Sequence, residues 1–152
     1  MTYIATLIAA IVALISIQQY FLAHERFKLD LFEKRFSIFK AAETFLSEII
    51  NRDFSGDCLQ KFDIETQTAV FLFGKDIVSF LKEIRLNANK IKTLREMHIQ
   101  FEAGSNERHE LVEKEIKIME SIMDTQKSLT DTFSRYLKFR NWKYKFLSGI
   151  SN

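Results

Sequence analysis

The chain has 152 residues, which is enough for one compact domain with an appendage and too few for two comfortable domains. It contains no proline and only four glycines, and this composition favours long helices because the usual interrupters are missing. Its single cysteine, Cys58, excludes an internal disulfide and suits a reducing compartment.

The first 23 residues, MTYIATLIAAIVALISIQQYFLA, carry no charged side chain. A helix of this length covers roughly 30 to 35 Å, about the thickness of the hydrocarbon core of a bilayer. Tyr3 and Tyr20 fall near the two interfacial aromatic belts of such a span. A cleaved signal peptide and a buried core helix are the alternatives, but no Lys or Arg precedes Arg26 and no convincing A-x-A cleavage site follows. We therefore predict an uncleaved membrane anchor over residues 1–23.

The charges around this segment predict its orientation. Arg26, Lys28, Lys34 and Arg35 follow it and no basic side chain precedes it. Because basic residues stay preferentially on the cytoplasmic side, we expect a single-pass protein with its N-terminus outside and its body in the cytoplasm.

A row of small residues recurs every four positions in the segment, at Ala5, Ala9 and Ala13. Such a small-xxx-small row allows two membrane helices to approach closely, so self-association through this face is a hypothesis. Alanine is common in membrane helices, and chance is the alternative explanation of the row.

The glycines divide the remainder into four expected helices, over about 24–51, 57–73, 76–102 and 106–140. Short links between them favour antiparallel packing. The predicted fold is all-α, with a single N-terminal transmembrane helix followed by an antiparallel bundle of about four helices. The predicted domains are the anchor at 1–23, a cytoplasmic bundle at 24–137 and a basic aromatic tail at 138–152.

Apolar side chains three or four positions apart predict the face that each helix buries. In the first body helix, FEKRF at 32–36 reads as two inward rings with Glu33, Lys34 and Arg35 on the solvated face. The expected core positions are Leu31, Phe32, Phe36, Ile38, Phe39, Phe45, Leu46, Ile49, Ile50, Leu59, Phe62, Thr66, Ala69, Phe73, Ile77, Phe80, Leu81, Ile84, Ala88, Ile91, Leu111, Ile118, Ile122, Leu129, Phe133 and Tyr136.

The chain nearly ends on FRNWKYKFL, in which aromatic and basic residues alternate. If the helices run back and forth, the C-terminus returns to the bilayer surface. On a helical projection Phe139, Trp142 and Phe146 share a narrow arc with lysines beside it, as in an interfacial segment. The predicted membrane-interface residues are Tyr3, Tyr20, Lys138, Phe139, Trp142, Lys143, Lys145 and Phe146. Packing of the rings on the first body helix is the alternative. Nucleic-acid binding ranks third, because the body is slightly acidic.

No pattern of catalytic or metal-binding residues is strong. His24, His98 and His109 are scattered, and His109-Glu110 lacks the second histidine of an HExxH zinc site. Gly74 is followed by Lys75, but no glycine-rich loop surrounds it, so it reads as a helix junction. We predict no catalytic residue, metal or cofactor.

The stretches LDLFEKRFSIFKAAETFLSEI and TAVFLFGKDIVSFLKEI resemble a loose group of small, uncharacterised bacterial proteins with an N-terminal membrane anchor. The resemblance covers mainly residues 25 to 90. It implies a bacterial membrane-anchored helical protein, and hence the inner membrane, but it implies no activity.

The sequence thus predicts a non-enzymatic membrane protein that acts as an interaction or assembly module. Its expected partners are the lipid bilayer and either a protein partner or copies of itself. One alternative is a self-associating effector that perturbs the membrane, of toxin or phage-defence type. The second is an enzyme whose catalytic residues are dispersed along the chain.

Overall fold

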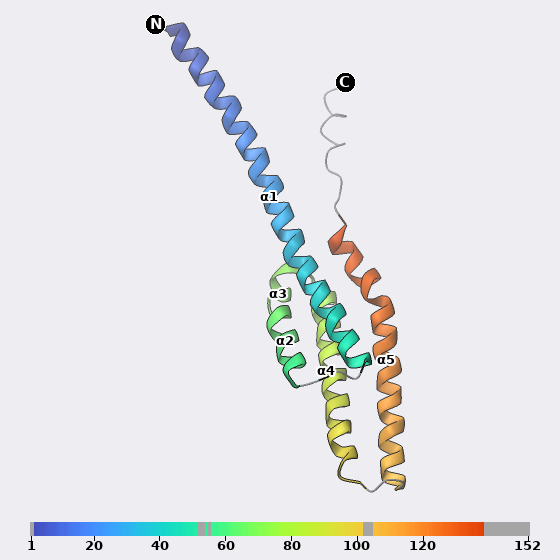
Figure 1. Cartoon of the computed structure of the whole chain (residues 1–152). Helices are drawn as coiled ribbons and strands as arrows, with labels where there is room; N and C mark the ends of the chain where they lie inside the picture. Colours follow the sequence, from blue (N-terminus) through green and yellow to red (C-terminus); the bar gives the residue numbers. More distant parts are fainter. Residues whose placement is uncertain (1, 52–53, 55, 102–104, 139–152) are drawn as a thin grey trace, which may run out of the picture. The chain divides into compact units, whose positions relative to one another are not determined.

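The computed structural model describes residues 2–51, 54, 56–101 and 105–138, and it describes the side chains there except at positions 2, 5 and 56. These residues form helices and no strand, so the predicted all-α class is confirmed (Figure 1). The helices are α1 (Thr2–Ile50), α2 (Gly56–Thr66), α3 (Ala69–Leu72), α4 (Lys75–His98) and α5 (Asn106–Leu137).

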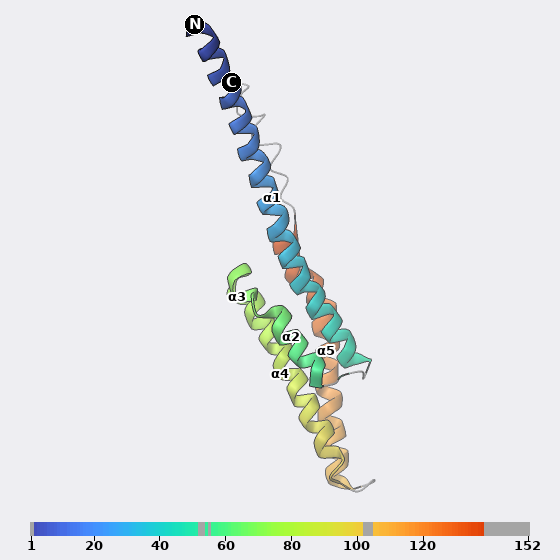
Figure 2. The same cartoon turned by 60° about the vertical axis from the view of Figure 1, so that its left-hand side comes forward.

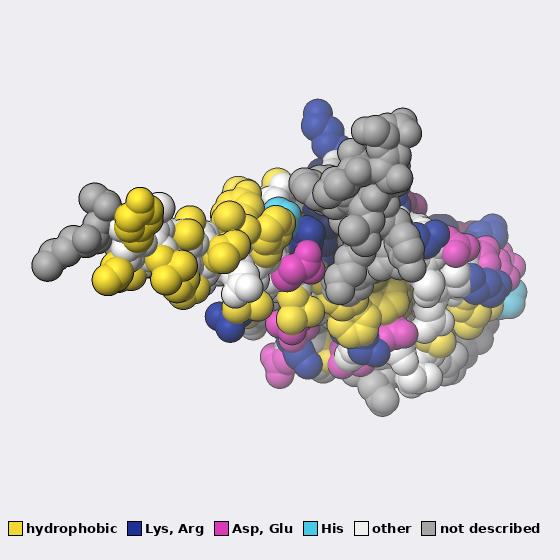
Figure 3. Space-filling model, turned by 90° about the horizontal axis from the view of Figure 1, so that it is seen from above, with side chains coloured by type: hydrophobic (Ala, Val, Ile, Leu, Met, Phe, Trp, Pro, Cys, Tyr) yellow, Lys and Arg dark blue, Asp and Glu magenta, His cyan; other side chains and the backbone are white. Residues whose placement is uncertain are grey.

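Packing divides the chain into two units, Met1–Lys34 and Arg35–Asn152, and α1 contributes residues to both. In the N-terminal part of the first unit the apolar side chains of α1 face outward on all sides, and hydrophobic side chains predominate on the face of this part that Figure 3 shows. Exposed fractions lie between 48% and 88% for Tyr3, Ile4, Leu7, Ile8, Ile11, Val12, Leu14, Ile15, Ile17, Tyr20, Phe21 and Leu22. By length and composition, α1 is the one described helix that could cross a membrane.

The second unit has a hydrophobic core with aromatic rings at its centre. Phe45 of α1 stacks on Phe62 of α2 with ring centroids 4.3 Å apart. Phe39 of α1 meets Phe133 of α5 edge to face at 5.6 Å. The most deeply buried side chains are Ile38, Phe45, Leu46, Ile49, Ile77, Ile84, Ile91, Ile122, Leu129 and Phe133.

Helices α4 and α5 lie side by side in both views of the fold (Figures 1 and 2). Asp76, at the start of α4, pairs with Arg135 at the end of α5, whereas Arg95 near the end of α4 pairs with Glu115 near the start of α5. These two helices therefore run in opposite directions. A hydrogen bond from the Arg108 amide to the Ser105 hydroxyl caps the beginning of α5.

Most predicted elements agree with the structure, and two details differ. The helix expected over 57–73 is interrupted at Gln67 and Thr68, and the interruption separates α2 from α3. Phe36, expected to face the core, is 43% exposed, whereas the neighbouring row of Ile38, Phe45 and Ile49 is buried. The buried face of this part of α1 is therefore centred on Ile38, Ala42, Phe45, Leu46 and Ile49.

Candidate functional site

The predicted membrane-interface residues fall into three groups. Tyr3 and Tyr20 are 88% and 71% exposed on α1, and Tyr20 stacks on His24 with centroids 6.4 Å apart. Lys138 is exposed, and its backbone N–H donates to the Ser134 carbonyl at 3.0 Å just beyond α5. The other positions of the proposed tail, Phe139, Trp142, Lys143, Lys145 and Phe146, lie outside the described residues.

The predicted self-association face is described in part. Ala9 and Ala13 are both exposed on α1, whereas the side chain of Ala5 is outside the described set. Two exposed alanines four residues apart leave the helix backbone approachable along this line.

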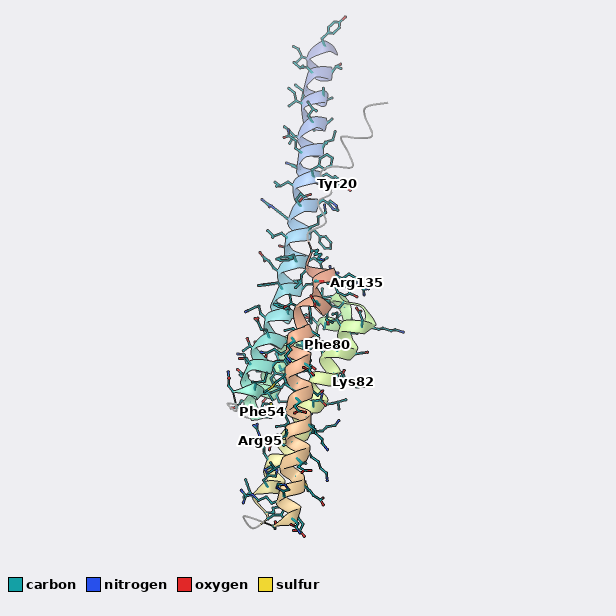
Figure 4. All side chains as sticks on the ribbon, turned by 90° about the vertical axis from the view of Figure 1, so that its right-hand side faces the viewer. Tyr20, Phe54, Phe80, Lys82, Arg95 and Arg135 are labelled. Carbon is teal, nitrogen blue, oxygen red and sulfur yellow. The ribbon has the colours of Figure 1, made fainter. Side chains whose placement is uncertain are left out.

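The most connected polar group of the second unit surrounds Tyr136, and we call Arg35, Gly74, Asp76, Arg135 and Tyr136 the Tyr136 cluster. The Tyr136 hydroxyl donates to Asp76 Oδ1 at 2.8 Å and accepts from the Gly74 amide at 3.2 Å. Arg135 Nη2 donates to Asp76 Oδ2 at 2.8 Å. These contacts tie the end of α5 to the first turn of α4, and Figure 4 labels Arg135 at that end of the bundle.

Arg35 joins α1 to the same group. Its Nε donates to the Leu72 carbonyl at 3.0 Å, and its Nη1 lies 3.5 Å from the Tyr136 carbonyl oxygen. Its guanidinium carbon is 5.8 Å from the ring centroid of Phe73 and 5.6 Å from that of Tyr136, within the range of cation–π contacts. The prediction that Arg35 belongs to the solvated face is therefore wrong, because the ends of α3 and α5 cover this side of α1.

The Tyr136 cluster needs glycine at position 74 for steric reasons. A Cβ built on Gly74 would lie 2.5 Å from Tyr136 Oη and 2.6 Å from Asp76 Oδ1. The backbone at Gly74 has φ of −75°, which any residue adopts, so the requirement comes from the close approach and not from the backbone conformation. Gly74 is the N-cap of α4, in agreement with the predicted helix junction.

Electrostatics favour the charged forms of Asp76 and Arg135 in this cluster. The pKa of Asp76 is lowered, first by the hydrogen bond from Tyr136 and further by the Ile77 amide and the charge of Arg135. The pKa of Arg135 is raised, chiefly by its contact with Tyr136. A carboxylate held in its charged form is a weak general base near neutral pH, so the Tyr136 cluster suits a structural role better than proton transfer.

A second polar group, formed by Arg95, His98 and Glu115, lies toward the other end of the α4–α5 pair, where Figure 4 labels Arg95. Arg95 Nε donates to Glu115 Oε1 at 2.9 Å, and His98 Nδ1 lies 3.6 Å from Glu115 Oε2. Arg95 Nη2 and His98 Nε2 are buried and have no partner among the described residues. No pattern in the sequence indicates this group, because its members are dispersed over two helices.

The described residues contain no set of three His, Cys, Asp or Glu side chains arranged to hold a metal ion. His109 is mostly exposed and lies 3.7 Å from Glu113 on its own helix. Comparison with protein-family models, curated proteins and solved structures finds no match for this chain.

Proposed function

We propose that this chain is a non-enzymatic, membrane-anchored interaction or assembly protein of the bacterial inner membrane. In this proposal residues 1–23 span the bilayer and the rest forms an antiparallel helical bundle in the cytoplasm. The observation that carries the proposal is the continuity of α1. One helix, Thr2–Ile50, begins with outward-facing apolar side chains and ends in the core of the folded unit.

The energetics of α1 favour a lipid environment for its first part. Apolar surface left in water is unfavourable by roughly 25 cal/mol per Å². A helix that is apolar on every side is stable when it is buried in protein or in a membrane. Because none of the candidate span is buried by the rest of the described chain, lipid is the environment that we propose.

The proposed orientation rests on the basic residues after the span. Arg26, Lys28 and Lys34 follow the span, and basic residues stay preferentially on the cytoplasmic side. Cys58 is the single cysteine of the chain and cannot form an internal disulfide, which is in keeping with a reducing compartment.

The proposed role of the tail is supported by the positions where the chain enters and leaves the folded unit. Arg35 is the first residue of this unit, and it contacts the carbonyl oxygen of Tyr136, two residues before Lys138. The segment before Arg35 and the segment after Lys138 are therefore joined to the same end of the bundle. We propose that the tail contacts the membrane from which the anchor emerges, with each lysine near an anionic leaflet contributing about 1 kcal/mol.

The proposal is tested by deletion of residues 1–23 followed by membrane fractionation. We expect the shortened protein in the soluble fraction and the full chain in the membrane after carbonate extraction. Deletion of 139–152 is the control, and that variant should stay in the membrane. Retention of the chain without residues 1–23 in the extracted membrane would contradict an anchor at the N-terminus.

The exposed Ala9 and Ala13 favour a second candidate, in which self-association of the anchor perturbs the membrane. In that case overexpression depolarises cells and Ala9→Leu suppresses the effect, because leucine keeps the helices apart. Ile11→Leu, about 200° away around the helix, is the matched control and should depolarise like the native chain. Normal membrane potential during overexpression of the native chain would reject this candidate.

A further inference from the structure

A groove of about 590 Å³ runs between α4 and α5, apart from the Tyr136 cluster. We call it the lysine groove. Its apolar lining comes from Leu86, Leu94 and Ile118, and its volume is within the usual range of ligand sites. Its lining residues are Leu86, Asn89, Lys90, Thr93, Leu94, Lys114, Lys117 and Ile118.

The lysines of this groove carry charge that the described residues leave largely uncompensated. Lys90 and Lys117 are exposed, and in the described part of the chain neither forms an ion pair. Lys114 approaches Glu110 at 3.9 Å, but both side chains are mostly exposed, so this contact neutralises little. The groove therefore suits a partner that offers apolar side chains flanked by carboxylates.

The same chain presents such a surface on another side of α5. Val112, Ile116 and Met123 are 37%, 53% and 41% exposed, and their spacing of four and seven residues places them on one line, which we call the α5 stripe. Glu113 and Glu120 lie beside this line and are exposed. Apolar and acidic groups thus occur together, with the charge opposite to that of the lysine groove.

We propose that the lysine groove binds the α5 stripe of a second copy of this chain. An amphipathic helix in a groove is a common mode of recognition, in which anchors at i, i+4 and i+11 meet the apolar floor while charges pair at the rim. Leu86 is 49% exposed, so the groove is open enough to accept a helix. The inference rests on the proposed assembly function and specifies its partner.

The placement of the two surfaces defines the kind of assembly. At 100° per residue, the stripe positions on α5 are about 180° from the groove positions Lys114, Lys117 and Ile118. In a two-fold symmetric pair, each copy would have to present both its groove and its stripe to the same neighbour. Because the two surfaces lie on opposite sides of α5, one neighbour cannot contact both. Such head-to-tail contacts generate rings when the rotation closes and open filaments when it does not.

Disulfide crosslinking of the full chain in membranes tests this contact. One tagged copy carries Thr93→Cys in the groove, and a second copy with a different tag carries Ile116→Cys in the stripe. Both copies also carry Cys58→Ser. We expect a crosslink between the two different copies that exceeds the crosslinks between identical copies. Gln60→Cys, on the exposed surface of α2, replaces Thr93→Cys in the control pair and should give background yield.

Charge reversal shows whether the lysines and glutamates make the contact. Lys114→Glu with Lys117→Glu in the groove copy should lower the crosslink yield on the order of tenfold, because like charges then meet. Glu113→Lys with Glu120→Lys in the stripe copy should restore the yield. Lys82→Glu, on the exposed surface of α4 outside the groove, should leave the yield unchanged.

Membrane fractionation and thermal melting of each variant separate this inference from the proposed function. If the variants are folded and membrane-bound but crosslink only at background yield, the inference is overturned. The proposed membrane anchor is not affected by that result. Predominant crosslinking between identical copies would also overturn the inference, because a two-fold pair would then be present. If a cysteine variant fails to fold, Lys90→Cys with Val112→Cys tests the same contact. Recovery of the folded native chain from the soluble fraction would instead overturn the proposed function.

Discussion

At the residue scale, the Tyr136 hydroxyl is the centre of a compact set of contacts. It accepts from Gly74, donates to Asp76 and lies 3.2 Å from Arg135 Nη2. Tyr136→Phe removes these hydrogen bonds and keeps the ring, which packs edge to face on Phe73. We expect the free energy of unfolding to fall by about 1 kcal/mol, measured by chemical denaturation.

The close approach at Gly74 predicts a coupling with the same hydroxyl. Gly74→Ala should destabilise the native protein by about 1 to 3 kcal/mol, because the new Cβ displaces Tyr136 Oη. In the Tyr136→Phe background the loss should be smaller, because one of the two oxygens that obstruct the methyl group is absent and only Asp76 Oδ1 remains. Equal losses in the two backgrounds of this double-mutant cycle would contradict the steric explanation.

The lowered pKa of Asp76 predicts how stability depends on pH. A group whose folded pKa is depressed stabilises the protein above its unfolded pKa, here 3.8, and loses that contribution as pH falls through the folded value. The native protein should therefore exceed Asp76→Asn in melting temperature above about pH 5, and the difference should shrink as pH falls below 3.8. A difference that is constant between pH 7 and pH 2 would contradict this assignment.

At the scale of elements, the ends of most helices were predictable from local sequence signals such as glycines. The polar contacts between helices were not predictable in this way. Glycines and the Ser105 cap mark the boundaries of α4 and α5, and those boundaries were predicted to within a few residues. The break before α3 contains no glycine or proline, so nothing local marks it beyond the weak helix preference of Thr66 and Thr68. Arg35 was misassigned because residues far along the chain cover it, and a single helix pattern does not contain that information.

Burial differences between aromatic residues predict which elements hold the folded unit together. Phe133 is fully buried and packs edge to face on three rings. These are Phe39 of α1, Phe73 between α3 and α4, and Phe80 of α4. Phe133→Ala should lower the free energy of unfolding by about 3 to 5 kcal/mol. Phe71→Ala is the matched control, since Phe71 on α3 is 85% exposed and its removal should change stability by less than about 0.5 kcal/mol. Similar losses for both variants in denaturant titrations would refute the packing described for α5.

At the scale of the whole molecule, α1 continues from its apolar first part into the folded unit, where Arg35 contacts the Tyr136 carbonyl oxygen near the end of α5. The long apolar N-terminal helix, the all-helical class and most core positions were predicted from the sequence because these depend on composition and periodicity. The Tyr136 cluster was not predicted, because Arg35, Asp76 and Tyr136 are brought together only by tertiary packing.

The proposed tail contact has a natural probe, because Trp142 is the only tryptophan of the chain. In full-length protein reconstituted into anionic vesicles, its fluorescence should be quenched by brominated lipids, and zwitterionic vesicles should weaken the quenching. Lys143→Glu with Lys145→Glu should reduce the quenching, whereas Lys82→Glu should not. Quenching by aqueous iodide alone would indicate a tail in solvent.

We propose that α1 crosses a membrane with its N-terminus outside and carries the folded unit in the cytoplasm. Single cysteines at Tyr3→Cys or Lys82→Cys, each with Cys58→Ser, can be exposed to a membrane-impermeant maleimide on intact bacterial spheroplasts. We expect labelling at position 3 in intact spheroplasts, and labelling at position 82 only after the membrane is opened. Labelling at position 82 in intact spheroplasts, or protection of position 3, would contradict this proposal.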